Sequence, residues 1–266
     1  TKTGAGTLTL TGANAYAGPT QVNAGFLYID GNQSAATGVT TVAPLATLGG
    51  KGVVGGNLTV ADGATLAPGS QGALGTLTIN GNLLLSSASR LAMSAGPTGS
   101  DLIDVKGNLT LDGILDLDIA SGTNAGPGVH RLLSYGGALS DYGLMLDGAA
   151  TSGWSIQTGV AHQVNLIDTR GMAFSFWDGD AGPANDGIIH GGNGTWQNAG
   201  ATSKTNWTDA RGATNTAFGD GSFAVFQGTP GTVTVDAAHG DINVAGMQFA
   251  SDGYVVQGDA IHLAGS

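Results

Sequence analysis

The 266-residue sequence contains no cysteine and no glutamate, and only eight of its residues are Lys or Arg. The lack of cysteine excludes disulfide bonds, thiolate catalysis and cysteine-ligated zinc. The formal net charge is −11, and all 19 acidic residues are Asp. Because a phosphate-binding surface needs clustered Lys and Arg, which this sequence lacks, nucleic acid is excluded as a partner.

Glu, Lys and Arg normally cover the surfaces of helices, and the sequence has no Glu and few Lys or Arg, so the residues for helix surfaces are scarce. No run approaches the roughly 20 apolar residues of a membrane-spanning helix. The abundant residues are Gly, with 48 copies, and Thr, Val, Leu, Asn and Asp. These residues favour short strands and tight turns, so the composition predicts an all-β protein.

Short apolar phrases recur along the chain. GNLTV at residues 56–60, GNLLL at 81–85 and GNLTL at 107–111 are 25 and 26 residues apart, and other leucines recur after 18 or 19 residues. Apolar and polar residues alternate within the phrases, as half-buried strands require. Return of a phrase after about 20 residues favours a solenoid over a sandwich. We therefore predict a right-handed parallel β-helix with about three short strands per turn.

This register places a set of leucines in the interior of the coil. The leucines expected to face inward are Leu8, Leu10, Leu58, Leu77 and Leu109. The threonines and asparagines between them are expected to face water.

Two groups of phrases carry a resemblance to a known family. GAGTLTLTGANAYAGPTQVNAGFLYI at residues 4–29 and ATLGGKGVVGGNLTVADGATLAPGS at 46–70 resemble the passenger-associated repeat of bacterial autotransporters, and GTLTINGNLLL and SDLIDVKGNLTLDGILDL continue the similarity. GNGTWQNAG, TNWTD, AVFQGTPGTVTVD and GMQFASDGYVVQGDAIHL, within residues 192–263, resemble a second repeat of the same passengers. We expect the first repeat type over residues 1–170 and the second over 171–266, in one continuous solenoid cut from a longer chain.

The resemblance implies a type V secreted passenger at the bacterial cell surface or outer membrane, or released from it. It further implies an outer-membrane β-barrel of the same chain outside these residues. The implied partners are a host surface, the extracellular matrix or another copy of the chain. Passengers with this fold act in adhesion, aggregation or biofilm formation, or serve as stalks for an effector, and the fold alone does not decide among these roles.

Oxygen-bearing side chains gather in DGDAGPANDG at residues 178–187, where calcium is the conceivable cofactor. The spacing departs from the EF-hand loop, because Pro183 holds the position that needs Gly and Ile189 the position that needs Glu. An Asx-rich turn explains the same residues. We expect no metal and no other cofactor, and Asp178, Asp180 and Asp186 are the ligand candidates if calcium binds.

A second acidic group raises the alternative of a polysaccharide hydrolase or lyase, because paired carboxylates cleave glycosidic bonds or hold a catalytic calcium. Its members are Asp101, Asp104, Asp112, Asp116 and Asp118. A lyase also needs a base, and Lys106 is the only one nearby. Solvent-facing strand positions explain these aspartates without any chemistry.

Histidines and tryptophans offer no stronger site. His130, His162, His190, His239 and His262 form no short ligand pair, and a GxSxG nucleophile motif is missing. Trp196 and Trp207 belong to the second repeat and are expected to fill the interior, whereas Trp177 beside Asp178 is a candidate for stacking on carbohydrate.

The sequence therefore predicts no catalytic residues and a non-enzymatic segment that supports surface display, folding and adhesion. The polysaccharide-acting enzyme and the passive stalk for an effector outside this segment remain as alternatives.

Overall fold

The computed structural model describes residues 1–69, 73–96, 99–119, 126–147 and 153–264. The chain forms two compact units. The first consists of Thr1–Gly126 with Arg131–Thr151, and the second consists of Pro127–His130 with Ser152–Ser266. The expected change of repeat type near residue 170, and the continuity of one solenoid across it, stay predictions.

The first unit is built from three sheets whose neighbouring strands are almost all parallel. The first sheet has the order β1 (Thr7–Leu10), β3 (Phe26–Ile29), β5 (Thr47–Gly50), β8 (Thr65–Pro68), β11 (Arg90–Gly96), β15 (Ile114–Ile119) and β18 (Met145–Leu146), with β12 (Gly99–Ser100) antiparallel to β11. The second has the order β17 (Leu139–Asp141), β14 (Leu109–Leu111), β10 (Leu83–Leu85), β7 (Leu58–Val60), β4 (Thr40–Val42) and β2 (Thr20–Val22). The third contains β16 (Gly128–Tyr135), β13 (Leu102–Val105), β9 (Thr76–Ile79) and β6 (Val53–Val54).

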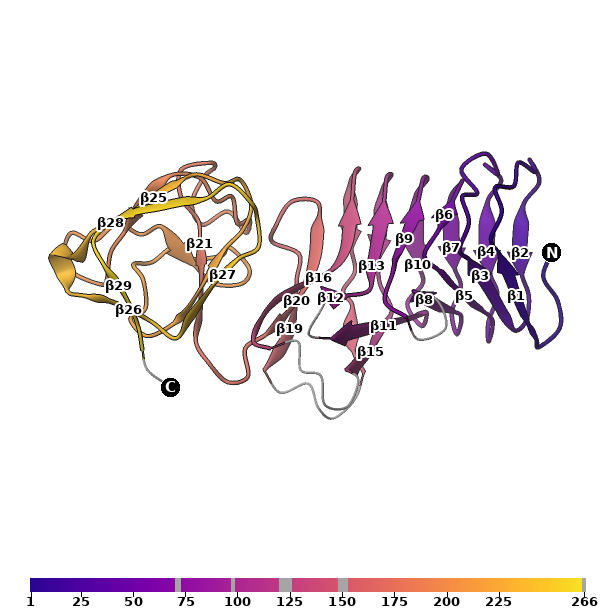
Figure 1. Cartoon of the computed structure of the whole chain (residues 1–266), viewed down its shortest axis with the longest axis horizontal. Coiled ribbons are helices and arrows are strands. Elements are labelled where there is room, and N and C mark those ends of the chain that lie inside the picture. Colours follow the sequence, from indigo (N-terminus) through magenta and orange to yellow (C-terminus); the bar gives the residue numbers. More distant parts are fainter. Residues whose placement is uncertain (70–72, 97–98, 120–125, 148–152, 265–266) are drawn as a thin grey trace. The chain divides into compact units, whose positions relative to one another are not determined.

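Consecutive strands of the chain belong to different sheets, so the chain winds around an axis. β8, β9 and β10 make one turn, and β11, β13 and β14 make the next, each strand pairing in parallel with its counterpart. Figure 1 shows the strands of successive turns lying side by side in this unit. The predicted parallel β-helix with three strands per turn is confirmed, while its right-handed sense stays a prediction.

Inward leucines stack in register along the axis of the first unit. In the first sheet the paired positions are Leu27, Leu48, Leu66, Leu91 and Leu115, each no more than 1% exposed. Burying one such side chain stabilises the fold by roughly 1.5–3 kcal/mol. A single turn cannot offset its own ordering entropy, so the stability comes from stacked neighbours.

The predicted inward register is confirmed for Leu58, Leu77 and Leu109, which are 0–1% exposed. Leu8 faces inward as predicted, but it is not covered. Leu8 pairs with buried Leu27 and so shares its register, yet it is 42% exposed because β1 is the edge strand of its sheet. Leu10 on the same strand is half-buried.

One of the recurring spacings has a different origin from the others. Leu58 pairs with Leu83, 25 residues on, whereas Leu77 lies in the third sheet and pairs with Ile103. The distance of 19 residues between Leu58 and Leu77 is therefore not one turn of the coil. The spacing of the GNL phrases does correspond to one turn. In each phrase the Gly and Asn form the corner before a strand of the second sheet, and the Leu is the first residue of that strand.

Asparagines of the GNL phrases form a ladder at one corner of the coil. The side-chain oxygen of Asn57 accepts a hydrogen bond from the backbone N–H of Asn82 at 2.9 Å, and that of Asn82 accepts from Asn108 at 2.8 Å. Asn108 in turn accepts from the N–H of Ala138 at 2.8 Å. Each asparagine therefore satisfies a backbone donor one turn away, at a corner where the strand ladder is interrupted.

The glycine before each asparagine is required by this ladder. A Cβ atom at Gly81 would collide with the side-chain oxygen of Asn57, and a Cβ at Gly107 would collide with that of Asn82. The two residues of each GN dipeptide therefore act together. The glycine leaves room for the asparagine side chain of the preceding turn, and the asparagine accepts a hydrogen bond from the backbone of the following turn.

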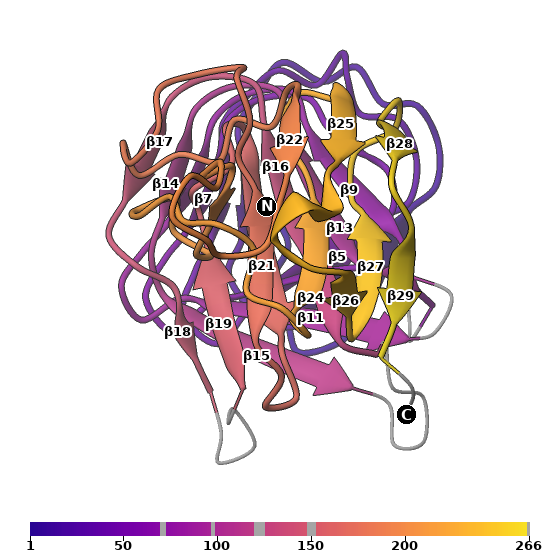
Figure 2. The same ribbon diagram turned by 90° about the vertical axis from the view of Figure 1, so that its left-hand side faces the viewer.

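The second unit repeats the coil with different packing. Its sheets have the orders β23 (Trp207–Thr208), β21 (Phe174–Trp177), β24 (Phe223–Phe226), β27 (Gly246–Phe249); β22 (Gly194–Trp196), β25 (Thr232–Val235), β28 (Val255–Gly258); and β26 (Ile242–Val244), β29 (Ile261–Leu263). Figure 2 shows β21, β24 and β27 side by side. The unit also contains the antiparallel pair β19 (Trp154–Gln157) and β20 (Gln163–Asp168), and the 3₁₀ helix η1 (Ala237–His239). Among the described residues no helix is long and apolar enough to span a membrane.

We expect Leu109→Asp to destabilise the first unit by several kcal/mol, because it places an unpaired carboxylate between Leu83 and Leu139 in the core. Thr110→Asp on the same strand is the matched control, since Thr110 alternates with buried neighbours and faces outward. Urea unfolding followed by circular dichroism measures both. Equal stability of the two variants would contradict the inward register.

We expect Asn82→Ala to cost about 1 kcal/mol, because the N–H of Asn108 loses its acceptor at an exposed corner. Asn82→Asp keeps an oxygen at the same position and should retain most of the stability. The comparison uses the same urea titration. A loss as large in Asn82→Asp as in Asn82→Ala would argue against the ladder.

Candidate functional site

Asp178, the first of the calcium candidates, lies directly after β21 and is 2% exposed. One carboxylate oxygen accepts a hydrogen bond from the backbone N–H of His190 at 2.8 Å, and the other accepts from the side-chain amide of Asn215 at 2.9 Å. Its own N–H donates to the carbonyl of Asn206. Asp178 thus joins three segments that are distant in the sequence, which is a structural role.

The charge of Asp178 also affects Tyr254. Burial, with a smaller contribution from the negative charge of Asp178, raises the pKa of the Tyr254 hydroxyl. The hydroxyl therefore keeps its proton, and it donates to the carbonyl oxygens of Gln227 and Thr229 at 2.7 and 2.9 Å.

The other two calcium candidates point to different partners. Asp180 is exposed and accepts from the backbone N–H of Asn193 at 2.7 Å. Asp186 accepts from the ring of His190 at 2.9 Å, and this hydrogen bond holds the pKa of the Asp186 carboxyl below its usual range. Within the described part of the chain, no three His, Asp or other ligand side chains gather closely enough to hold a metal ion.

Asp220 repeats the hydrogen bonding of Asp180, in which one aspartate binds both the backbone N–H and the side-chain amide of an asparagine. One oxygen of Asp220 accepts from the backbone N–H of Asn243 at 2.9 Å, and this bond lowers the pKa of the carboxyl. The side-chain amide of Asn243 donates to the same carboxylate, as the amide of Asn193 does to Asp180. Asp220 thereby fastens one coil to the next, whereas Asp180 closes a loop within one coil, and Asn193 makes the bond to the next coil by accepting from the N–H of Thr232 at 2.9 Å.

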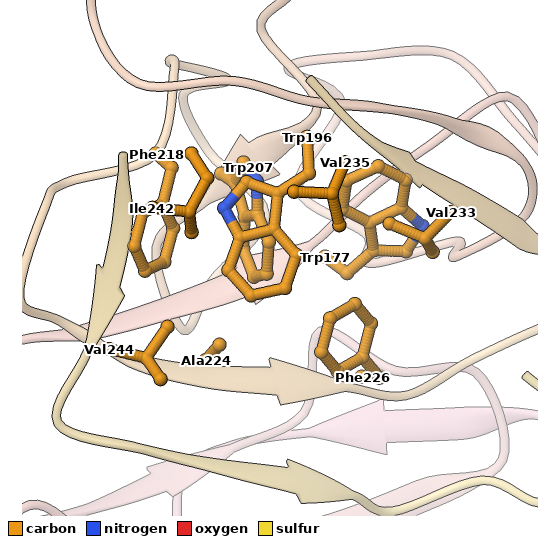
Figure 3. Close-up of a cluster of buried hydrophobic side chains, with 10 residues drawn as sticks. All are labelled: Trp177, Trp196, Trp207, Phe218, Ala224, Phe226, Val233, Val235, Ile242 and Val244. Atoms are coloured by element: carbon orange, nitrogen blue, oxygen red, sulfur yellow. The ribbon is translucent and has the colours of Figure 1, made fainter. Parts of the chain in front are cut away.

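Trp177 is fully buried, so its proposed role as a platform for carbohydrate is corrected. Its indole packs at 5.2 Å from the ring of Trp207, and its N–H donates to the carbonyl of Gly192 at 2.9 Å. Figure 3 shows the aromatic core to which both belong, together with Trp196, Phe218 and Phe226. The expectation that Trp196 and Trp207 fill the interior is confirmed, since both are 0% exposed.

The aspartates considered for polysaccharide chemistry are distributed over different faces. Asp104 pairs with Lys106 in the third sheet, and Asp112 accepts from the N–H of Gly113 at a turn. The side chain of Asp118 lies outside the described residues. Asp101 and Asp116 do line one surface groove, although Asp101 already accepts two backbone N–H groups.

The histidines are only partly brought together. His162 and His190 line one pocket of about 330 Å³ with Ile188 and Pro230, and His162 has a left-handed backbone with φ of 64°. The ring of His190 is hydrogen-bonded to Asp186, and the ring of His239 is hydrogen-bonded to the Thr202 hydroxyl on the exposed surface.

The fold and these contacts define a class of protein, the parallel β-helix. Its buried or paired aspartates, such as Asp178 and Asp220, and its buried tryptophans stabilise the coil. Comparison with known proteins agrees with this class. The family model described as the passenger-associated transport repeat matches residues 1–29. The adhesin BmaC autotransporter of Brucella suis biovar 1 (strain 1330) is 53% identical over 274 residues, a match that covers 99% of this chain and 8% of that protein.

The predicted resemblance to autotransporter passengers is therefore confirmed. The chain spans less than a tenth of the length of this curated relative. The second repeat type over residues 192–263 stays a prediction.

We expect Asp178→Ala to lower the free energy of unfolding by on the order of 3 kcal/mol, because two donors lose a charged acceptor in a buried site. Asp252→Ala removes the same charge from an exposed position and serves as the control. Thermal unfolding with calcium and with EDTA separates the two roles. A melting temperature of the parent chain that rises with calcium, and no longer does so in Asp178→Ala, would show a metal site instead.

Proposed function

We propose that this chain is a non-enzymatic segment of a surface adhesin, a β-helix that holds outward side chains in fixed register for contact with a host surface, matrix or another copy. The observation that carries the proposal is the 53% identity to an adhesin along nearly the whole chain. The match extends over 99% of the chain, so the aligned region contains the outward positions as well as the core.

The fold supports display because the outward positions of successive turns are aligned. In the second sheet the aligned outward residues are Gln21, Thr41, Thr59, Leu84, Thr110 and Ser140. Neighbouring parallel strands lie about 4.8 Å apart, so this row forms a regular, mostly hydroxyl-bearing stripe. Each member lies between two inward residues of its own strand, as Thr59 lies between Leu58 and Val60, so the stripe needs no ligand to be ordered.

The proposal places the chain at the cell surface or outer membrane, or in the surroundings after release. The enzyme alternative would need the two carboxylates that share a groove, Asp101 and Asp116, but Asp101 already accepts two backbone N–H groups and Asp116 pairs with Arg90. The passive stalk differs from the adhesin in one respect only, which is whether the outward face binds anything.

We expect beads coated with the 266-residue chain to adhere to cultured host cells or to immobilised matrix proteins more than beads coated with serum albumin. Sedimentation velocity measures association between copies in parallel. A correctly folded chain that binds neither cells, matrix nor itself would eliminate adhesion and leave the stalk.

A further inference from the structure

A groove of about 230 Å³ lies on the outward face of the first sheet. Its floor consists of small residues, Ala67 on β8 and Ala92 on β11, which follow the paired leucines Leu66 and Leu91. Tyr28 and Asp116 also line it. Ala92 pairs directly with Asp116 of the next turn.

The position of the tyrosine ring explains why the groove begins where it does. Tyr28 pairs with Gly49, and a Cβ atom at Gly49 would lie 2.8 Å from the ring atom Cε1 of Tyr28. The ring therefore leans over Gly49, toward Ala67 on the following turn. Two turns of small side chains then remain uncovered, which amounts to about 10 Å at 4.8 Å per turn.

A buried carboxylate forms part of the lining. Asp101 is 2% exposed, and its two oxygens accept from the backbone N–H groups of Gly75 and Ser94, both at 2.8 Å. A Cβ at Gly69 would lie 2.8 Å from one of these oxygens, and the φ of 80° at Gly69 also favours glycine. The Ser94 side chain is a third donor to Asp101. Since a carboxylate offers about four acceptor positions, capacity for one further donor remains.

The charges around the groove favour a neutral ligand. Asp116 is already paired with Arg90 at 3.3 Å, and Arg90 also contacts Asp147 at 2.9 Å. A basic peptide would compete with Arg90 for Asp116, and an anionic ligand would meet two carboxylates. Hydroxyl groups donate to such carboxylates without bringing a charge, and the apolar face of a sugar ring packs on an aromatic ring.

We propose that this groove binds one ring of a neutral glycan, with the Tyr28 ring against its apolar face and Asp101 and Asp116 accepting from its hydroxyl groups. The inference rests on the proposed adhesive function and names a ligand class for it. The groove is smaller than the roughly 300–1,000 Å³ of pockets that enclose drug-sized ligands, which suits a single ring of a longer glycan.

The probe is an array of neutral, sialylated and sulfated oligosaccharides, with an arginine-rich peptide beside it. We expect the chain to bind neutral glycans, and we expect Tyr28→Leu, which removes the ring, and Ala92→Leu, which fills the floor, to weaken that binding by about tenfold. Phe26→Leu is the matched control, because Phe26 lies on the same strand, is exposed, and does not line the groove. Circular dichroism confirms that each variant is folded.

Other outcomes overturn the inference: no glycan bound, binding to acidic glycans or the peptide only, or affinities unchanged in both groove variants. Release of reducing sugar from a bound glycan would show that the groove hydrolyses glycans and would overturn the proposal of a binding site alone. If the parent chain binds no glycan, and Tyr28→Leu and Ala92→Leu adhere to cells as well as the parent chain does, the groove is eliminated as a glycan site and the adhesive function stays. Glycan binding by a chain that adheres to no cell or matrix would eliminate the adhesive function and leave the groove as a glycan site.

Discussion

Hydrogen bonding between one turn and the next is the constraint on which this structure depends. The strands have two to eight residues, so each is too short to be stable alone and gains its order from the strand a turn away. At the corners the strand ladder stops, and side-chain acceptors continue it: Asn57, Asn82 and Asn108 in the first unit, Asn193 and Asp220 in the second. The corner residues are therefore as much part of the scaffold as the leucines.

This constraint separates scaffold from surface. A side chain that points inward must match its neighbours above and below, as Leu83 does between Leu58 and Leu109. A side chain that points outward meets its neighbours at the strand spacing but is free of the core, so its chemistry can change without cost to the coil. Tyr28 and Ala92 are of this kind. Function in such a protein is expected in the outward rows, where a large side chain beside small ones makes a groove.

Much of the fold could be predicted because its signals are local or strictly repeated. Period-two alternation and the return of GNL predict the strands, the turns and their stacking from the sequence alone. The candidate site could not be predicted in the same way. Burial of Asp178 depends on Asn215, 37 residues later, and burial of Trp177 depends on Gly192 and Trp207. No pattern within ten residues of Trp177 reports those contacts, and the exposure of Leu8 likewise depends on its edge position, not on its own phrase.

The absence of glutamate has a physical explanation in the same corner contacts. An acceptor that must reach the backbone of the adjacent turn works best on a short side chain, because Asp and Asn lose less rotamer entropy than the longer Glu when they are fixed. Asp62 accepts from the N–H of Ala88, and Asp259 accepts from the N–H of Ala237, each across one turn. Much of the net charge of −11 thus sits on carboxylates that are already occupied. The acidity of the chain accordingly follows from how the coil is fastened, which agrees with the proposed recognition of a neutral ligand through shape and hydroxyl-directed hydrogen bonds.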